Sequence, residues 1–426
     1  MDPGEHLKRE TGRPRARRGG THRVLIVTNG HPSRNPRPVK EAFALAEAGF
    51  DVTLLHVANH RPSVPLDRAL LAGAQFQVAS VDLLSGSPSR VFLVRARTAL
   101  ARRLNRFGAS RIEALGPAPE LLAKARRIPA DLTIVHNEIS HWVGLRLMRD
   151  GRRVSADIED WHSEDLLPAA RRERPLPTLR ALERTLLHSA VYVTTTSEAL
   201  AEALHATYGG ARPSAIMNAF PLQPPPEARL AGMIPRFFWF SQTIGPGRGL
   251  EAFIAAWALC SQHSRLVLLG DVNEAYRNRL VALATPARAA DLEFLPIVPA
   301  SELPGVIARH DVGLALEDAS IPNRDLTVTN KILQYLNAGL AVVASPTAGQ
   351  REVLAHAPEA GIVADFGDPR RMAVELDDFV ADRVRLEARR RAARGLAEAR
   401  YCWEREAPKL VALVRSALIR SPDGGS

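Results

Sequence analysis

One loop of this sequence combines glycines with a positive side chain at the start of a helix. The stretch SQTIGPGRGLEAFIAAW, residues 241–257, ends a predicted strand and begins a predicted helix, with Gly247 and Arg248 between them. Glycines let backbone amides approach a ligand closely, and the arginine adds positive charge, so the loop suits an anion such as a phosphate. The pattern also fits an ordinary glycine-rich turn with a solvated arginine, because short glycine motifs have low specificity.

A second stretch, NRDLTVTNKILQYLNAGL, residues 323–340, places a cation at a helix start. Thr329 can cap a helix that begins near Asn330, where the first amides lack intrahelical partners. Lys331 in the first turn opposes the helix dipole, and a bound anion would remove that penalty. A lysine that extends into water is the alternative. Because both stretches follow strands of one predicted sheet, we expect a single diphosphate to contact both.

A third set of polar residues follows strands in the first half of the chain. Gly30 follows the first strand, and the stretch DIEDWHSED places Glu159, Asp160 and His162 after a later one. Histidine titrates near neutrality and can donate or accept a proton, so we expect His162 to approach a reacting group, beside Glu159 and Asp160. A lone histidine in a loop is also often structural or solvated.

Two regions of alternating strands and helices position these loops. The chain has 426 residues, more than one hydrophobic core usually holds. Residues 22–222 and 236–398 each predict a doubly wound, Rossmann-like α/β domain with a parallel sheet. The proline-rich residues 223–235 predict a linker. Residues 399–420 predict an amphipathic helix that can cross back to the first domain, and residues 1–21 predict a disordered basic tail.

Composition excludes several classes of function. The two cysteines, Cys260 and Cys402, lie outside any CxxC or Cys/His pattern, so we expect no metal site of that kind. No GxGxxG or P-loop sequence supports a nicotinamide, flavin or P-loop enzyme, and we expect no cofactor. No apolar stretch is long enough to span a membrane. The net charge of +10 would suit a nucleic-acid-binding scaffold, but no nucleic-acid motif accompanies it.

A basic amphipathic stretch bears on location. Residues 90–111, RVFLVRARTALARRLNRFGASR, combine arginines with Leu, Ala and Phe at helical spacing. Such a helix can lie on an anionic membrane, and the alternative is a surface helix with a solvated face. We therefore expect a cytoplasmic protein, peripheral on the inner face of the membrane if this helix contacts lipid.

Three segments resemble a known family. FFWFSQTIGPGRGLEAFIAAW, DVGLALEDASIPNRDLTVTNKILQYLNAGLAVVAS and TAGQREVL are similar to the donor-binding domain of bacterial family-four retaining glycosyltransferases, glycosyl transferases group 1. RVLIVTNGHPSRNPRPVKEAFALAEAGFDVTLL, VTTTSEALAEAL and IMNAFP add to the resemblance, which spans about residues 22–415. It implies the GT-B fold, in which two Rossmann-like domains face each other across a cleft.

The resemblance also implies a function. It points to transfer of a hexose from a UDP- or GDP-sugar to a saccharide or lipid-linked acceptor, with retention and without metal. Cell-surface polysaccharide or glycolipid synthesis is the expected setting. A nucleotide-sugar epimerase or hydrolase of the same fold is the alternative, and analysis of the products separates the two.

The resemblance assigns roles to particular residues. Arg248 in the loop of Gly247 would contact the donor diphosphate. Lys331 would lie close to the same phosphates, with Thr329 and Asn330 offering the cap and amides of the helix. Gly30 matches the first-domain loop that approaches donor and acceptor. Asn218 matches the asparagine that enters the linker.

Three positions depart from the family pattern. Leu326 and Gln334 stand where many members carry glutamates, the second of which holds the donor ribose. Gln334 can still bond a ribose hydroxyl, although without charge assistance. Leu326 has no polar group, which leaves Glu317, Asp318 or Asp325 as replacements. Gln242 stands where an arginine is common.

Overall fold

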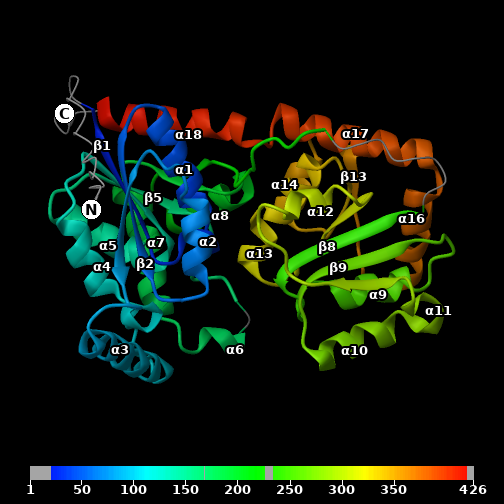
Figure 1. The fold of residues 1–426 in the computed structure, drawn as a ribbon, viewed down its shortest axis with the longest axis horizontal. Coiled ribbons are helices and arrows are strands. Elements are labelled where there is room, and N and C mark those ends of the chain that lie inside the picture. Colours follow the sequence, from blue (N-terminus) through cyan, green and yellow to red (C-terminus); the bar gives the residue numbers. More distant parts are fainter. Residues whose placement is uncertain (1–20, 167, 226–233, 420–426) are drawn as a thin grey trace, which may run out of the picture.

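The computed structural model describes residues 21–166, 168–225 and 234–419 as two α/β domains around separate parallel sheets (Figure 1). Residues 1–20 of the predicted basic tail and residues 226–233 of the predicted linker lie outside the described residues. The two-sheet architecture confirms the doubly wound fold that the alternation of strands and helices predicted.

The N-terminal domain contains a seven-stranded sheet in the order β3-β2-β1-β4-β5-β6-β7, with parallel pairing throughout. The strand order reverses between β1 and β4, and ligands of open parallel sheets bind beyond the carboxyl ends of strands at such a reversal. The strands are β1 (Arg23–Thr28), β2 (Asp51–Ala58), β3 (Gln77–Asp82), β4 (Leu132–His136), β5 (Val154–Ile158), β6 (Val193–Thr195) and β7 (Ser214–Ala215).

The C-terminal domain repeats this arrangement with a six-stranded parallel sheet in the order β10-β9-β8-β11-β12-β13. Its strand order reverses between β8 and β11, so the glycine-rich loop after β8 and the segment after β11 meet at the reversal. The strands are β8 (Arg236–Thr243), β9 (Arg265–Asp271), β10 (Leu292–Leu295), β11 (Val312–Ala315), β12 (Ala341–Ala344) and β13 (Gly361–Val363).

Helices cover both faces of each sheet, because strands of continuous apolar residues must be buried on both sides. In the N-terminal domain these are α1 (Arg37–Glu47), α2 (Ser63–Leu70), α3 (Pro88–Arg106), α4 (Ala118–Arg126), α5 (Asn137–Arg149), α6 (Pro168–Arg171), α7 (Leu176–Ser189) and α8 (Glu198–Tyr208), with 3-10 turns η1 (Pro32–Arg34) and η2 (Ile112–Leu115).

The remaining helices follow in the second half of the chain. They are α9 (Leu250–Trp257), α10 (Glu274–Leu283), α11 (Thr285–Ala289), α12 (Leu303–Ile307), α13 (Pro322–Leu326), α14 (Asn330–Asn337), α15 (Ala348–Leu354), α16 (Pro369–Ala381), α17 (Arg383–Ala399) and α18 (Trp403–Ile419), with the 3-10 turn η3 (Pro358–Ala360). None of the helices within the described ranges is both long and apolar enough to cross a membrane.

The last helix, α18, lies along the N-terminal domain, beside α1 (Figure 1). Its side chains Leu410, Val414 and Ala417 are buried in the same core as Val39 and Leu45 of α1. The chain therefore returns to its first domain after completing the second, and this apolar packing ties the two domains together at one end.

Close packing fixes the position of α14, the helix that carries Lys331. Gly313 in β11 lies directly under the ring of Tyr335, where an added Cβ would lie 2.2 Å from the Cγ atom of that ring. Only a residue without a side chain permits this approach. Tyr335 is fully buried, so the glycine sets how near α14 comes to the sheet and where its first turn lies.

Candidate functional site

The glycine-rich loop between β8 and α9 places Arg248 at the strand reversal of the C-terminal sheet. Gly247 and Gly249 have φ values of 77° and 74°, a conformation that other residues rarely adopt. These two turns bring the Arg248 side chain to Glu317, with Nη1 at 3.1 and 3.3 Å from its two carboxylate oxygens. Glu317 follows β11, so the contact joins the two sides of the reversal.

Lys331 reaches the same carboxylate. Its Nζ atom donates to Oε1 of Glu317 at 2.9 Å, and both side chains are buried. The ring of Trp239 lies below the ammonium group, 5.4 Å from Nζ to its centroid. The structure thus brings the two predicted cations together, and a protein carboxylate balances the charge of Lys331 at the helix start.

Burial and charge act against each other at this cluster. Burial favours the neutral form of Glu317, but the charges of Lys331 and Arg248 outweigh it and hold the Glu317 pKa below its ordinary value. Burial lowers the pKa of Lys331, and the attraction of Glu317 only partly offsets this effect. A doubly charged anion near Lys331 would further stabilise its ammonium form.

A third cation, Arg324, was missed by the sequence analysis. Its Nη1 atom donates to the carbonyl oxygen of Gly247 at 2.6 Å, so it holds the glycine-rich loop from the opposite side. No motif identified Arg324, because α13 is short and its place beside the loop depends on the tertiary fold. Arg248, Lys331 and Arg324 together outnumber the single carboxylate of Glu317 and make the cluster suited to an anion.

The structure corrects the predicted cap of α14. Thr329 occupies the N-cap position, but its side chain makes no capping hydrogen bond, and its hydroxyl oxygen is buried without a partner among the described residues. Asn330 is exposed, and Gln334 is half-buried one turn further along the same helix. The helix start therefore presents uncapped amides and an unsatisfied hydroxyl beside Lys331.

Of the three acidic residues considered in place of Leu326, only Glu317 contacts the cations. Asp318 accepts a hydrogen bond from the amide of Ser320, and Asp325 accepts one from the amide of Ala348 at the start of α15. These two carboxylates therefore support local turns and helix starts.

In the N-terminal domain, the loops after β1 and β4 meet at the corresponding reversal. Thr28 donates to the side-chain oxygen of Asn137 at 3.0 Å, and Asn29 donates to Glu138 at 3.4 Å. Asn137 has a φ of 68°, which is uncommon for a residue with a side chain and is often found at functional sites.

The loop that contains Gly30 is fixed by its neighbours. His31 is buried, and its Nδ1 atom lies 2.5 Å from Asp67, while the amide of Ser33 donates to the same carboxylate at 2.8 Å. Nothing lies within 4 Å of the position that a Cβ of Gly30 would take. The loop is thus held in place with open space beside its glycine.

The predicted loop after β5 runs from the half-buried Glu159 and Asp160 to the buried His162, and these three titratable residues have different partners. Glu159 accepts hydrogen bonds from Asn35 at 3.2 Å and Asn218 at 3.1 Å. Burial and the neighbouring Asp160 raise the pKa of Glu159 to about 7. Asp160 accepts from Nδ2 of Asn323 at 3.0 Å, a residue of the C-terminal domain.

His162 is the residue of this loop with an open hydrogen-bonding atom. Its Nδ1 atom lies 3.9 Å from Glu138, whereas its Nε2 atom is buried without a partner among the described residues. Arg174 donates to Glu138 at 2.7 Å. Burial alone would raise the Glu138 pKa, but His162 and Arg174 hold it near 2, so this carboxylate is ionised.

The short helix α13 connects the two predicted sites. Asn323 contacts Asp160 and also accepts from the amide of Trp161 at 2.7 Å. The next residue, Arg324, contacts Gly247 in the loop of Arg248. Consecutive residues of one helical turn therefore join two sites. One is the loop after β5 that contains His162, here called the histidine loop. The other is the anion cluster of the second domain, which consists of Arg248, Lys331, Arg324 and Glu317.

The domains also meet at the start of α8. Glu352 of α15 accepts hydrogen bonds from the amides of Glu198 and Ala199 at 3.0 and 2.9 Å. The hydroxyl of Ser197 donates to the carbonyl of Leu326 at 2.6 Å. A carboxylate at a helix start satisfies free amides and interacts favourably with the dipole, so these contacts favour the observed domain arrangement.

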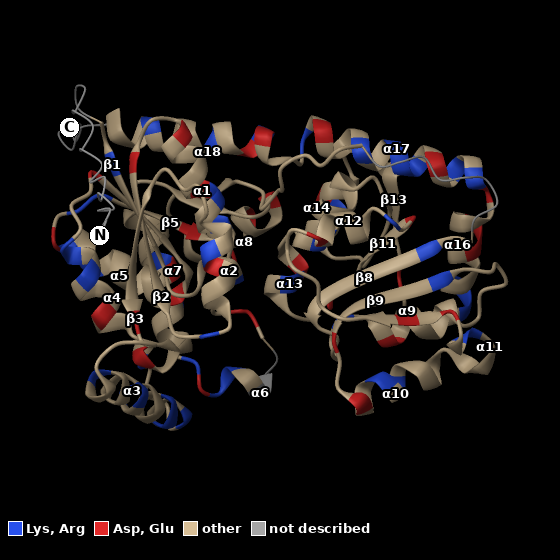
Figure 2. Cartoon of the chain, viewed as in Figure 1, with Lys and Arg blue, Asp and Glu red and all other residues tan. Residues whose placement is uncertain are grey.

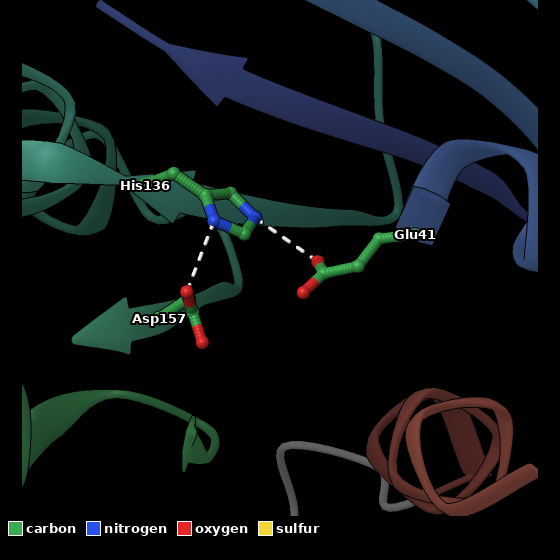
Figure 3. Close-up of side chains that lie close together, drawn as sticks. All are labelled: Glu41, His136 and Asp157. Carbon is green, nitrogen blue, oxygen red and sulfur yellow. Dashed lines mark ion pairs between the residues drawn. The ribbon is translucent and has the colours of Figure 1, made fainter. Parts of the chain in front are cut away.

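A buried cluster joins Glu41 of α1, His136 at the end of β4 and Asp157 of β5 (Figure 3). The two nitrogens of His136 lie 3.0 Å from Glu41 and 3.2 Å from Asp157. Burial opposes protonation of His136, yet the two carboxylates raise its pKa to about 10. These residues have donor types that bind metals, but both oxygens of Asp157 already accept from Arg37, at 2.7 and 2.8 Å. Arg37 and protonated His136 balance the two carboxylates, which fits a charge-paired core better than a cation site.

Residues 235–382 match a family model described as glycosyl transferases group 1. A sucrose-phosphate synthase structure from Thermosynechococcus elongatus has a TM-score of 0.69 at 17% identity, covering 94% of this chain and 100% of that one. HepE of Anabaena in complex with UDP has a TM-score of 0.66 at 16% identity, covering 93% and 100%.

A putative UDP-N-acetylglucosamine 2-epimerase from Listeria monocytogenes also matches, with a TM-score of 0.58 at 12% identity, over 94% of this chain and 98% of that one. No curated protein sequence matches the chain. At these identities the structures show a common fold, and they confirm the two-domain GT-B architecture that the resemblance implied.

Proposed function

We propose that this chain is a glycosyltransferase that uses a UDP-sugar as its donor, because residues 235–382 match the glycosyl transferases group 1 model and the whole chain has the GT-B fold. Structures of HepE contain UDP and UDP-glucose, and this supports the uridine nucleotide over the guanine alternative. The single observation that carries the proposal is the convergence of Arg248, Lys331 and Arg324 at the strand reversal of that domain.

These cations suit the chemistry of the departing diphosphate. As the bond between sugar and phosphate breaks, negative charge builds on the leaving oxygen, and fixed positive charge at that place stabilises the transition state. Arg248 and Lys331 are held by Glu317, so little reorganisation is needed when the phosphates arrive. Gly247 offers backbone next to them, and the free hydroxyl of Thr329 and amides from Asn330 onward add donors.

The positive side chains supply the charge that a metal ion supplies in other transferases, and we therefore propose a metal-independent reaction. We also propose retention of the anomeric configuration, which rests on the family resemblance. Proton NMR of the first product formed reports the configuration, and activity that survives EDTA would support metal independence.

His162 is proposed to contact the transferred sugar or the attacking hydroxyl. It is the residue of its loop whose ring has a buried nitrogen without a partner, and Glu138 beside its other nitrogen is ionised. Glu159 and Asp160 are engaged by amide side chains, so we propose that they shape and tune this loop. Gln334 is proposed to bond the donor ribose, and Gly30 to leave room for the sugar.

The helix α3 supports a membrane-associated acceptor. It packs through Val94, Ala101 and Asn105, so its other side faces outward. Phe92 and Phe107 are 73% and 79% exposed there. Arginines line this helix, which contains no acidic residue (Figure 2). Exposed apolar side chains beside arginines match the surface of an anionic membrane.

We therefore propose a saccharide or lipid-linked acceptor at the cytoplasmic face of the membrane, in glycolipid or cell-surface polysaccharide synthesis. Sedimentation with vesicles tests the contact. The wild type is expected to bind vesicles that contain phosphatidylglycerol and to release them at high salt, because salt screens the arginines. A variant with Phe92→Ser and Phe107→Ser should bind less. Equal binding to neutral vesicles would contradict the charge argument.

Calorimetric titration tests the donor site. Wild type is expected to bind UDP and UDP-glucose, and Arg248→Ala should weaken both by about tenfold or more, because charge-assisted hydrogen bonds are lost. Lys331→Gln should act in the same direction. Arg279→Ala is the matched control, since that arginine is exposed on α10 of the same domain. Full affinity in Arg248→Ala and Lys331→Gln would overturn the site.

Product analysis separates transfer from the epimerase alternative, which the Listeria structure keeps open at the level of fold. A transferase should release UDP from UDP-glucose slowly with water and faster with an acceptor. An epimerase would instead yield an isomeric nucleotide sugar. Absence of both reactions, with no nucleotide sugar bound, would contradict the proposed function.

A further inference from the structure

A pocket of about 320 Å³ lies in the N-terminal domain beside the histidine loop. This volume falls within the roughly 300–1,000 Å³ typical of small-molecule sites. Its lining comes from α3, η2, the start of α5 and the segment around α6. The polar lining residues are Asn29, Arg102, Glu138, Glu173 and Arg174. Apolar contacts come from Leu115 and Leu166, so the pocket mixes hydrogen-bonding groups with hydrophobic surface.

Two features of this pocket are unusual for an ordinary surface hollow. The Nε atom of Arg174 is buried and has no hydrogen-bond partner among the described residues. An unpaired buried donor costs free energy and is expected to meet a ligand or water. Leu166 has a φ of 73°, a strained conformation for a residue of this size. Both residues line the same pocket.

The charge of the pocket favours an anion. Arg174 is paired with Glu138, and Glu173, which also lines the pocket, is paired with Arg106 from outside the lining. Arg102 donates its Nε to the carbonyl of Ala114 at 3.0 Å, and no carboxylate of the described residues lies within ion-pair distance of its guanidinium. The guanidinium of Arg102 therefore lines the pocket without a paired carboxylate.

The pocket also lies between the reaction centre and the outward face of α3. Glu138 lines it and approaches His162 to within 3.9 Å. Arg102 belongs to α3, and on the same helix Leu100 is 58% exposed. A molecule with its saccharide at Glu138 would therefore place its next group at Arg102 and any alkyl chain at the exposed face of α3.

We propose that this pocket is the acceptor site and that it selects an acceptor whose saccharide is attached to a phosphate. The inference rests on the proposed function, because it takes His162 as the residue nearest the reaction. The unpaired Nε of Arg174 and the guanidinium of Arg102 bind the phosphate oxygens. Glu138 and Asn29 bond hydroxyls of the saccharide, and Leu115 and Leu166 contact its apolar face.

The test measures binding of soluble probes to the full chain with UDP at saturation, so that the donor phosphates are occupied. Glucose 1-phosphate is expected to bind, and methyl glucoside, which lacks the phosphate, should bind at least about tenfold more weakly. Arg102→Ala should lose about tenfold in affinity for glucose 1-phosphate. Arg103→Ala is the matched control, because it removes an equal charge from the next position of α3, outside the pocket lining.

A second arm distinguishes a free sugar phosphate from a lipid-linked one. Decyl glucosyl phosphate should bind more tightly than glucose 1-phosphate, and Leu100→Ser should remove that gain without affecting glucose 1-phosphate. Equal affinity for the two probes would assign the pocket to free sugar phosphates and overturn the lipid part of the proposal. Equal binding of methyl glucoside and glucose 1-phosphate would overturn the phosphate part.

UDP affinity is recorded for every variant, which separates this inference from the proposed function. If wild type fails to bind UDP, the donor assignment fails. If wild type binds UDP but not glucose 1-phosphate, or if Arg102→Ala and Arg103→Ala lose affinity equally, the acceptor pocket is wrong while the donor site stands.

Discussion

Asn323 of the C-terminal domain donates a hydrogen bond to Asp160 of the N-terminal domain, with 3.0 Å between Nδ2 and Oδ1. The oxygen atom of the same side-chain amide, Oδ1, accepts a hydrogen bond from the backbone amide of Trp161 at 2.7 Å. One buried side chain thus fixes two positions of the loop that ends in His162. Arg324 is the next residue and donates a hydrogen bond to the glycine-rich loop. The helix α13 therefore fixes the position of the glycine-rich loop relative to the loop of His162.

Replacing Asn323 should therefore affect turnover more than donor binding. Asn323→Ala is expected to lower kcat for UDP-glucose cleavage by about tenfold, since misplacement of a loop next to the reaction is costly. The affinity for UDP should change by less than about twofold. Asn278→Ala, at an exposed position of α10, is the control. An unchanged kcat in Asn323→Ala would show that the contact between domains does not position the loop.

Glu317 is expected to oppose anion binding while it stabilises the empty protein. Glu317→Gln removes the buried negative charge between Arg248 and Lys331, so UDP should bind several-fold more tightly. The same change leaves Lys331 buried without an anionic partner and should lower the free energy of unfolding by about 3 kcal/mol. Calorimetry and urea unfolding measure the two effects. Weaker UDP binding would instead indicate that Glu317 contacts the donor directly.

The sequence predicted those features that depend on local pattern. Alternating apolar strands and helices predicted both sheets, and the glycines around Arg248 predicted a loop between a strand and a helix, which the structure places between β8 and α9. The pairing of Asn323 with Asp160 joins residues separated by 163 positions and depends on how the domains pack, for which local pattern carries no signal. The sequence also could not predict that Thr329 makes no capping hydrogen bond, because the residue type shows only that a threonine is able to cap a helix.

The elevated pKa of Glu159 makes stability depend on pH. Burial and Asp160 raise this pKa from 4.5 to about 7, so the folded state holds the proton more tightly than the unfolded state. The associated stability is complete below about pH 4.5 and is lost as the pH rises through about 7. Relative to Glu159→Gln, wild type should lose up to about 3 kcal/mol between pH 4.5 and 8.

Urea unfolding of both proteins at several pH values measures this difference. The Gln variant keeps a neutral side chain of the same shape, so its difference from wild type isolates the titration of Glu159. A constant difference across that range would mean that Glu159 does not change protonation there. A pH-dependent difference accompanied by a shifted pH profile of UDP-glucose cleavage would connect the same proton to the reaction centre.

Two glycine substitutions test whether close packing of α14 positions Lys331. Gly313→Ala would place a Cβ 2.2 Å from the ring of Tyr335, so α14 must shift, and overpacking should cost about 1–3 kcal/mol. Gly395→Ala is the control, since nothing lies within 4 Å of its Cβ in α17 and alanine should stabilise that helix by about 0.5–1 kcal/mol.

The shift of α14 should also reach the anion cluster. Lys331 lies in the first turn of that helix, and its contact with Glu317 at 2.9 Å leaves little tolerance for movement. Gly313→Ala is therefore expected to weaken UDP binding measurably, whereas Gly395→Ala should leave it unchanged. If Gly313→Ala loses stability but binds UDP as wild type does, the position of Lys331 is set by its ion pair with Glu317 and not by the packing of Tyr335 on the sheet.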